Sequence, residues 1–336
     1  SPRDYTTMNA ETHGVIIGRF MPPHAGHQYL VDFGRNMCDR LSVLVCTLSS
    51  EEIPGELRYR WMQELFPDVE MIHITEEIPE ARKDSPTAIP IWAQTVRERL
   101  SAAPTYVFAS EDYGAPLASE LGARFIPVDP ARRQFPVSAT MIRENPLANW
   151  NYLPEPVRPY FLRRVRVVEP TYRSVGSGGG GAGGAGGESG SLAARLAAHY
   201  HTLFVSDYAE FWEKSMGAVG RAELPLVQAA QQAVEDSLAR RASRVLFCDS
   251  DPLQIALRRG FDTESAGKDA GPRSAVADDD PGDAEKSSDR GYDLTLLVGP
   301  GELADRMAAV LHRGGHPFAR IGAASEHELL DQAGSE

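Results

Sequence analysis

The sequence contains few cysteines and no long apolar run. Cys38, Cys46 and Cys248 are its only three Cys residues, and they lack the close pairing of a metal site. Two of them lie in apolar runs, where a thiol behaves as a small hydrophobic group, so we expect a protein of the reduced cytoplasm. No stretch approaches the roughly 20 uninterrupted apolar residues that a membrane helix needs, so we expect no membrane span.

An excess of positive charge is also missing. The formal net charge is −13 at pH 7, whereas general nucleic-acid binders gather Lys and Arg against the phosphate backbone. Residues 1–13 are mostly polar, without the apolar core of a secretion signal, and we expect a flexible N-terminus. No helix-turn-helix pattern precedes Gly14, so neither nucleic acid nor a membrane is an expected partner.

The length of 336 residues fits two domains. From residue 14, apolar runs of strand length alternate with amphipathic helical stretches, and this order predicts an α/β fold with a parallel sheet covered by helices on both faces. Such sheets bind ligands beyond the carboxyl ends of their strands. In the first domain the expected strands are 14–18, 41–48, 69–75, 105–110 and 123–128, with helices at 56–66 and 91–100.

A change in composition follows a further strand at 165–168. Residues 174–190 are mostly Gly, Ser and Ala, too poor in side chains to pack a core. We therefore predict a first domain over 14–168, a Gly-rich linker or deformed phosphate loop over 169–190, and a second, smaller α/β domain over 191–336. Its expected strands are 203–206, 244–249, 293–298 and 318–321, its helices 191–200, 226–240, 302–312 and 326–333, and its acidic insert near 264–290 is expected to be disordered.

The most informative segment runs from Gly18 to His27 and reads Gly-Arg-Phe-Met-Pro-Pro-His-Ala-Gly-His. It follows the first strand directly and precedes an amphipathic helix expected to begin near Gln28. His24 and His27 can converge on one anion there, and the helix N-terminus adds N–H groups and positive dipole. Gly26 leaves the backbone free to approach a phosphate. The segment predicts a site that stabilises charge developing during transfer at a phosphorus atom.

A second anion-binding segment, Val137 to Arg143, follows the last strand of the first domain. Ser138 can cap a short helix, while the Thr140 hydroxyl and neighbouring N–H groups face a polyphosphate. Arg143, one turn further on, adds a charged fork. Arg132 and Arg133 lie in the preceding loop. For Arg19 and Arg133 we leave open whether they face solvent or the pocket.

Together the two segments resemble the motifs of HxGH nucleotidyltransferases. The chain around them, over 14–168, is similar to NadR-like bifunctional proteins, which pair a nicotinamide mononucleotide (NMN) adenylyltransferase with a ribosylnicotinamide kinase. The resemblance implies a Rossmann-like nucleotidyltransferase domain followed by a P-loop-kinase-like domain, and the conversion of NMN and ATP to NAD and pyrophosphate with Mg²⁺ on the ATP phosphates. It implies ATP, NMN and NAD as ligands and leaves a homo-oligomer open. Met141 departs from the motif, which often carries Lys there.

The resemblance also assigns the site residues. Its catalytic residues are His24, His27 and Arg143. Trp92, expected in a loop before a helix, and Tyr113 are candidates to bind the substrate, Trp92 by stacking on the nicotinamide ring; the alternatives are core packing for Trp92 and an ordinary turn for Tyr113. The residues expected to bind ATP are Gly18, Arg19, Phe20, Gly26, Glu111, Ser138, Thr140 and Arg143.

The second domain departs from its expected motif. A working P-loop, G-x-x-x-x-G-K-[ST], needs its lysine to bind the β and γ phosphates, but the segment from Gly186 to Ser191 has none and the next lysine is Lys214. Asp249 and Asp251 end a strand in the manner of a Walker B motif. We predict an inactive kinase half. Two other functions stay open for the chain: adenylyl transfer to nicotinic acid mononucleotide, and nucleotide sensing without turnover.

Overall fold

The computed structural model describes residues 11–76, 78, 88–169, 190–250, 255 and 292–321. The chain divides into two compact units, Ser1–Val157 and Arg158–Glu336, which are described separately. None of the helices in the described ranges is long and apolar enough to cross a membrane.

The first unit is built on a parallel sheet with the strand order β3-β2-β1-β4-β5. All five strands expected from the sequence are present, and their ends differ from the expected ones by at most two residues. Each is a short run rich in apolar residues, and its length and apolar character identified it. The strands are β1 (His13–Gly18), β2 (Arg40–Cys46), β3 (Glu70–Ile74), β4 (Tyr106–Ala109) and β5 (Arg124–Pro127).

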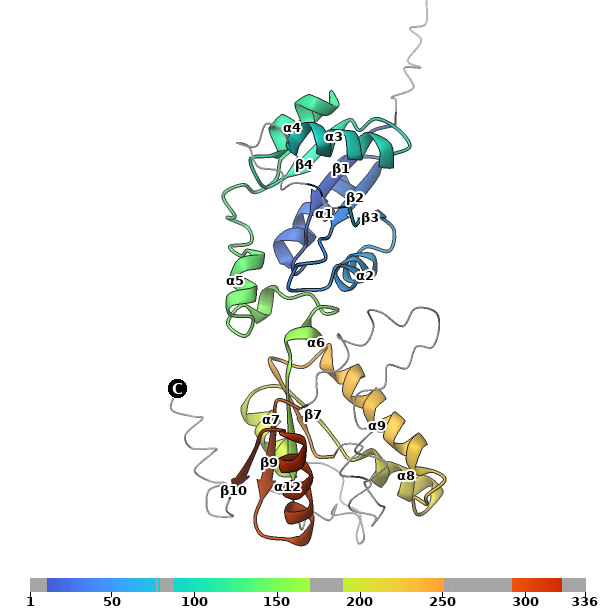
Figure 1. The fold of residues 1–336 in the computed structure, drawn as a ribbon, viewed down its shortest axis with the longest axis vertical. Coiled ribbons are helices and arrows are strands. Elements are labelled where there is room, and N and C mark those ends of the chain that lie inside the picture. The colour runs from blue at the N-terminus through green and yellow to red at the C-terminus, as the bar shows by residue number, and fades with distance from the viewer. Residues whose placement is uncertain are drawn as a thin grey trace, which may run out of the picture. The chain divides into compact units, whose positions relative to one another are not determined.

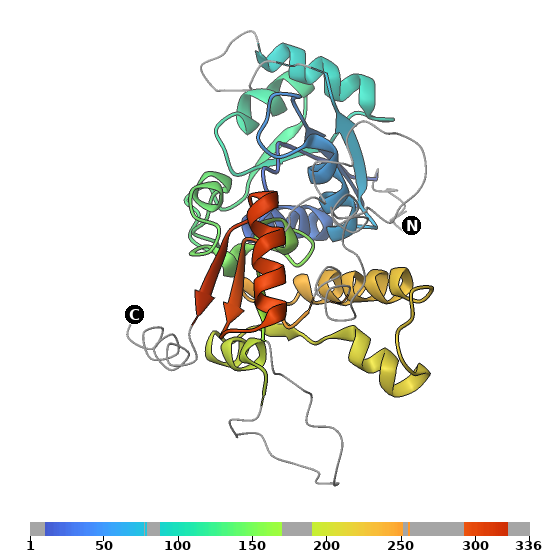
Figure 2. The same ribbon diagram turned by 60° about the horizontal axis from the view of Figure 1, so that its bottom comes forward.

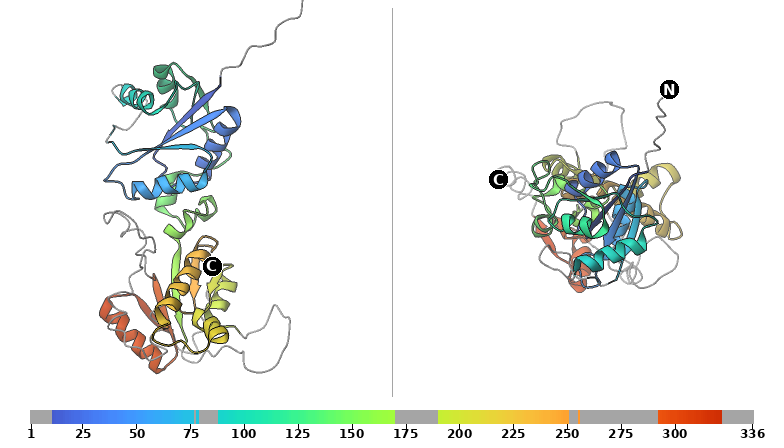
Figure 3. Two further views of the ribbon diagram at one scale, coloured as in Figure 1. Left: turned by 90° about the vertical axis from the view of Figure 1, so that its right-hand side faces the viewer. Right: turned by 90° about the horizontal axis from the view of Figure 1, so that it is seen from above.

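Helices cover both faces of this sheet, as predicted. Val15 and Ile17 of β1 pack towards α3 and α4, whereas Ile16 between them packs towards α1 and α2. This alternation follows from the pleat of a strand. Figure 1 shows the two helix pairs on opposite sides of the strands, and Figure 3 shows the same layers from the side. The helices are α1 (Ala25–Met37), α2 (Gly55–Leu65), α3 (Ala88–Arg99) and α4 (Gly114–Leu121), followed by α5 (Ala139–Glu144) and the short 3-10 helix Trp150–Tyr152.

The second unit holds another parallel sheet, with the order β10-β9-β6-β8-β7. Its central strand corrects the domain boundary that the sequence placed at residue 168. Strand β6 (Arg163–Val168) pairs with β8 and β9, so the first unit ends before Arg158. The amino-acid composition changes after β6, but β6 itself already belongs to the second sheet. Both sheets have five strands among the described residues, whereas the sequence predicted a smaller second domain.

The remaining elements of the second unit lie close to their expected positions, except that the helices α6 (Arg158–Phe161) and α8 (Tyr208–Met216) were not predicted. Apolar side chains of α12 pack on Val168 and Leu297, and Figure 2 shows this helix alongside β9 and β10. The expected helix at 326–333, the acidic insert and residues 174–189 lie outside the described residues. The elements are α6 (Arg158–Phe161), α7 (Leu192–His199), β7 (Leu203–Val205), α8 (Tyr208–Met216), α9 (Leu224–Ala239), β8 (Val245–Cys248), β9 (Leu294–Val298), α12 (Glu302–Gly314) and β10 (Phe318–Ile321).

Candidate active site

The order of strands in the first sheet locates the candidate site. The chain leaves β1 for β2 on one side, whereas β4 pairs with β1 on the other. The loops after neighbouring strands diverge at such a reversal and leave a crevice at the carboxyl ends. The segment 18–27 begins at the end of β1, so the topology places it at this crevice.

The two histidines of this segment are in contact. His24 is the N-cap of α1, and its Nδ1 accepts a hydrogen bond of 3.1 Å from the Gly26 N–H. The rings of His24 and His27 are stacked, with centroids 3.7 Å apart and an interplanar angle of 24°. The helix begins at Ala25, three residues before the expected start, so His27 lies in its first turn. The two imidazoles therefore lie together at the start of α1, and their role in binding an anion stays a prediction.

Both imidazoles are held neutral. Burial, assisted by the charge of Arg132, lowers the pKa of His24 to about 4. Burial also lowers the pKa of His27 well below its ordinary value, and the neighbouring His24 and Arg132 add to the effect. Because Nδ1 of neutral His24 accepts a bond, its Nε2 carries the proton and is a donor. The Nδ1 of His27 is buried and bonds to no group among the described residues.

The ring of Phe20 packs against the ring of His27. Its side chain is 2% exposed and belongs to the core between β1 and α1. The ring meets the His27 ring edge-on, at 4.9 Å between centroids and 67° between planes. Phe20 adopts a left-handed backbone conformation, with φ of 47°, which costs energy in a residue other than glycine. The structure therefore places Phe20 in the core behind His27.

The second predicted segment reaches the first through Arg143. Ser138 caps α5, as expected, by accepting a bond of 3.2 Å from the Met141 N–H. Arg143 donates from Nη2 to the Thr140 hydroxyl at 3.3 Å and from Nη1 to the Met21 carbonyl at 2.5 Å. The Met21 carbonyl belongs to the loop that carries both histidines. Arg143 thus joins residues 122 positions apart in the sequence at one site.

The loop before α5 brings a further cation close. Asp129 accepts backbone N–H bonds of 2.7 and 3.0 Å from Arg133 and Gln134, which gives the loop its shape. The charge of Arg132 helps to lower the pKa of both histidines, and its Nη2 is 3.6 Å from a carboxylate oxygen of Glu111. Glu111, predicted to bind the nucleotide, is exposed and at the end of β4. Arg133 is exposed to solvent.

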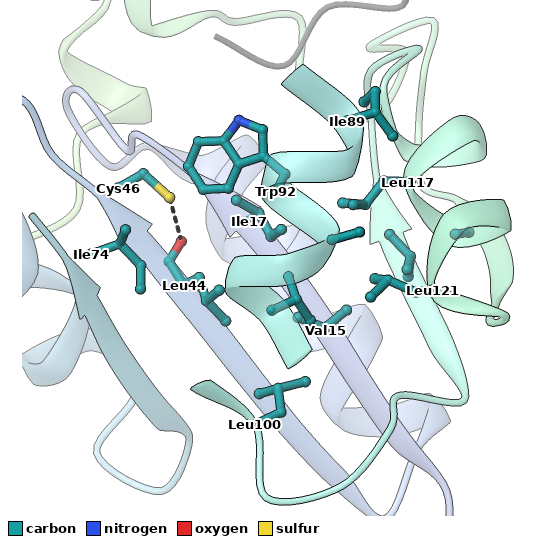
Figure 4. Packing of buried hydrophobic residues seen from close by; sticks show 14 of the residues in the cluster. Val15, Ile17, Leu44, Cys46, Ile74, Ile89, Trp92, Leu100, Leu117 and Leu121 are labelled. Carbon is teal, nitrogen blue, oxygen red and sulfur yellow. Dashed lines mark hydrogen bonds between the residues drawn. The ribbon is translucent and has the colours of Figure 1, made fainter. Parts of the chain in front are cut away.

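Two predicted substrate residues have structural contacts. Trp92 lies within α3, not in a loop before it, because the helix begins at Ala88. Its side chain is 6% exposed and packs near Cys46 and Ile17, as Figure 4 shows. Tyr113 donates its hydroxyl to the Ile17 carbonyl at 2.6 Å and so ties the start of α4 to β1. Substrate contacts of Trp92 and Tyr113 stay predictions.

One buried ion pair was not predicted. Arg58 of α2 is fully buried and pairs with Glu51. Its Nη1 donates to the Arg19 carbonyl at 2.5 Å, within the histidine segment. Arg19 itself is half exposed and lies 3.3 Å from Glu51. A charged residue in a helix is usually solvated, so nothing in the sequence pattern marked Arg58.

A cavity of about 670 Å³ lies at the opposite edge of the same sheet. It is lined by Arg35, Arg40, Asp68 and Glu70 among others, near the beginnings of β2 and β3. None of the predicted site residues lines it. Its position at the amino ends of the strands separates it from the crevice where parallel sheets hold ligands.

The second sheet has a smaller candidate site. Ser191 caps α7 and donates to Asp249 at 2.6 Å, and both line a cavity of about 250 Å³ that Lys214 also lines. The carboxylate of Glu169 accepts the Leu192 N–H at 2.9 Å, at the helix N-terminus where a phosphate would bind. Asp251 lies outside the described residues.

The sequence of the chain is similar to part of two known proteins. No protein-family model matches the chain. The chain is 28% identical over 174 residues to the trifunctional NAD biosynthesis/regulator protein NadR of Escherichia coli (strain K12), which covers 47% of this chain and 42% of that protein. The NadR of Salmonella typhimurium is 28% identical over 171 residues, 46% of this chain and 42% of its own length. The chain thus matches less than half the length of these relatives.

Solved structures of NadR share the fold. A crystal structure of NadR in complex with NAD and AMP-PNP has a TM-score of 0.69 at 18% identity, over 96% of this chain and 95% of that one. A second, in complex with NR, has a TM-score of 0.71 at 18% identity over the same shares. The chain is thus similar to NadR in part of its sequence and in its fold, and the two-domain α/β fold expected from the resemblance is confirmed.

Proposed function

We propose that the first unit is an adenylyltransferase that joins NMN to the AMP part of ATP, in NAD biosynthesis or salvage. The observation that carries this proposal is the bond from Arg143 to the Met21 carbonyl, which unites the two predicted phosphate-binding segments. The similarity to NadR, described as an NAD biosynthesis protein, supports it.

The reaction is a single displacement at phosphorus. A phosphate oxygen of NMN forms a bond to the α-phosphorus of ATP, and the bond from that phosphorus to the bridging oxygen breaks, so pyrophosphate leaves with the electron pair. Charge increases on the oxygens around the α-phosphorus and on the leaving group. Fixed N–H donors and cations at those positions lower the barrier, mainly by positioning and electrostatics.

Each of the two phosphate-binding segments contacts a different part of ATP. The Nε2–H of His24 and the ring of His27 donate to the α-phosphate oxygens, assisted by the first N–H groups of α1. Ser138, Thr140 and Arg143 bind the β and γ phosphates and the departing pyrophosphate. Within the described ranges no three His, Cys, Asp or Glu side chains gather as a metal site, and we assign Mg²⁺ to the phosphates of ATP itself.

The described site residues select the phosphates of the substrates and not the base of the acceptor. The phosphate-binding segments bind ATP and do not distinguish the amide of a nicotinamide ring from the carboxylate of a nicotinic acid ring. Nicotinic acid mononucleotide is therefore the alternative acceptor. Nucleotide sensing without turnover is a second alternative. The donors assembled at His24, His27 and Arg143 favour catalysis over sensing.

We further propose that the second unit does not phosphorylate a riboside. The P-loop lysine is missing from the sequence. The Leu192 N–H at the start of α7, which could bind a phosphate, donates instead to the carboxylate of Glu169. The bond between Ser191 and Asp249 is retained. Incubation with nicotinamide riboside and Mg-ATP should release no ADP above the blank; phosphorylated riboside that disappears in Asp249→Ala would contradict this.

The adenylyltransferase proposal is tested by turnover. The purified chain is mixed with Mg-ATP and either NMN or nicotinic acid mononucleotide, and the dinucleotide is separated by chromatography. We expect product from NMN and a loss of at least about 100-fold in His27→Asn, the usual cost of one transition-state donor. His13→Asn is the matched control, because His13 is also buried but lies at the opposite end of β1. No product from either acceptor would refute the proposal and favour sensing.

A further inference from the structure

The buried side chain of Arg58 donates hydrogen bonds to four residues near the start of the histidine loop, residues 18–27. Its Nε donates to the Ile53 carbonyl at 3.0 Å, and its Nη1 donates to the carbonyls of Arg19 and Cys46 at 2.5 and 3.4 Å. Its Nη2 donates to Glu51. One guanidinium therefore connects the end of β2, the loop before α2 and the peptide that follows Arg19.

Glu51 extends this connection and fixes the charge. Its side chain is 6% exposed, and it accepts the Leu48 N–H at 2.9 Å in addition to the bond from Arg58. Arg19 reaches the other carboxylate oxygen at 3.3 Å. A buried guanidinium without its carboxylate would be strongly unfavourable, so the pair acts as a unit.

The peptide that Arg58 holds lies directly before Phe20. Phe20 has the left-handed backbone conformation and packs edge-on against the His27 ring. Arg143 holds the Met21 carbonyl directly after Phe20. Two guanidiniums from different helices thus hold the carbonyls on either side of a strained residue that supports a catalytic histidine.

We propose that Arg58, with Glu51, is a positioning residue for adenylyl transfer: it acts through the Arg19 carbonyl and Phe20 to set the position of His27. The inference rests on the proposed function. Arg58 contacts neither ATP nor the acceptor; its loss displaces the segment that carries His27, which should both weaken ATP binding and slow the chemical step. A displacement of about 1 Å at such a site lowers the rate about 100-fold.

The test uses a double variant that removes both charges, Arg58→Met with Glu51→Gln. The matched control is Arg164→Met with Glu235→Gln, an Arg–Glu pair 3.4 Å apart in the other unit, in which Glu235 is buried and Arg164 is mostly buried. We expect the two double variants to lose similar thermal stability. In the Arg58 pair, kcat for dinucleotide formation should fall about 100-fold while KM for the mononucleotide changes less than about threefold; the control should keep wild-type kcat.

A conservative variant covers the case in which the double variant does not fold. Arg58→Lys keeps the charge opposite Glu51, but its single nitrogen cannot take the positions of three separate guanidinium nitrogens. We expect it to fold and to lose at least about tenfold in kcat. Wild-type kcat in Arg58→Lys, or in a folded Arg58→Met/Glu51→Gln, would show that the pair has only a structural role.

A binding measurement separates this inference from the function on which it rests. Calorimetric titration with Mg-ATP needs no turnover, and a displaced histidine loop should weaken ATP binding in the Arg58 variants but not in the control pair. Absence of dinucleotide from the wild type would refute the proposed function alone. Equal ATP affinity in wild type and Arg58 variants would refute the positioning role.

Discussion

Acid should destabilise the first unit through His24, and His24→Asn should remove the effect. Burial holds the pKa of His24 at about 4 in the folded chain, against 6.5 for an unperturbed histidine. The unfolded chain therefore binds a proton as the pH falls below 6.5, while the folded chain does not until about pH 4. At pH 5 the unfolded state is favoured by about 1.5 pKa units, or about 2 kcal/mol.

The substitution separates this titration from helix capping. His24 is the N-cap of α1, and Asn is also a good N-cap, so stability at pH 7 should change by less than about 1 kcal/mol. Between pH 7 and pH 5, the wild type should lose about 2 kcal/mol more stability than the variant. Burial, the largest cause of the lowered pKa of His27, is present in both proteins, so most of the contribution of His27 cancels in this difference.

The assay can be confined to the first unit. The chain has four Trp residues, Trp61, Trp92, Trp150 and Trp212, and only Trp212 lies in the second unit. In a Trp212→Phe background, urea unfolding followed by tryptophan fluorescence reports the first unit alone. Equal losses between pH 7 and pH 5, with and without His24→Asn, would show that His24 is not held neutral by burial.

Three further substitutions test separate parts of the site and fold. Arg143→Met removes the bond to the Met21 carbonyl and should lower kcat/KM for ATP about 10- to 100-fold with an unchanged circular dichroism spectrum; a change below about twofold would contradict its role. Gly114→Ala would bring a Cβ within 2.3 Å of the Phe125 ring and should cost about 1–3 kcal/mol in urea unfolding, so unchanged stability would refute this packing. Ser191→Ala removes the α7 cap and should lower the melting temperature of the second unit but leave dinucleotide formation at the wild-type rate; a loss of that activity would show that the second unit takes part.

The sheet and the phosphate-binding segments could be predicted because their signals are local. Each strand is a short run rich in apolar residues. The segment around His24 and His27 is identified by the spacing of its residues and by its position after β1. The capping role of Ser138 likewise follows from residues within one turn of it. The bond between Arg143 and Met21 could only be expected through the family resemblance, because 122 residues separate them.

The sequence predictions were wrong or incomplete where contacts between distant segments determine the structure. The boundary at residue 168 followed the change in composition, whereas the pairing of β6 with β8 and β9 assigns that strand to the second sheet. Trp92 was expected in a loop before a helix, yet α3 begins at Ala88 and buries it. Arg58 had no sequence signal, since only the fold brings the Arg19 carbonyl to its guanidinium.

The central claim is that the first unit directs attack to the α-phosphorus of ATP. Phosphorus NMR of the wild-type chain with NMN and Mg-ATP tests it most directly, because it identifies the bond that breaks. Matching signals of pyrophosphate and a dinucleotide diphosphate, both lost in His27→Asn, are the predicted result. Appearance of ADP or inorganic phosphate without pyrophosphate, or no change in the ATP signals, would contradict the account.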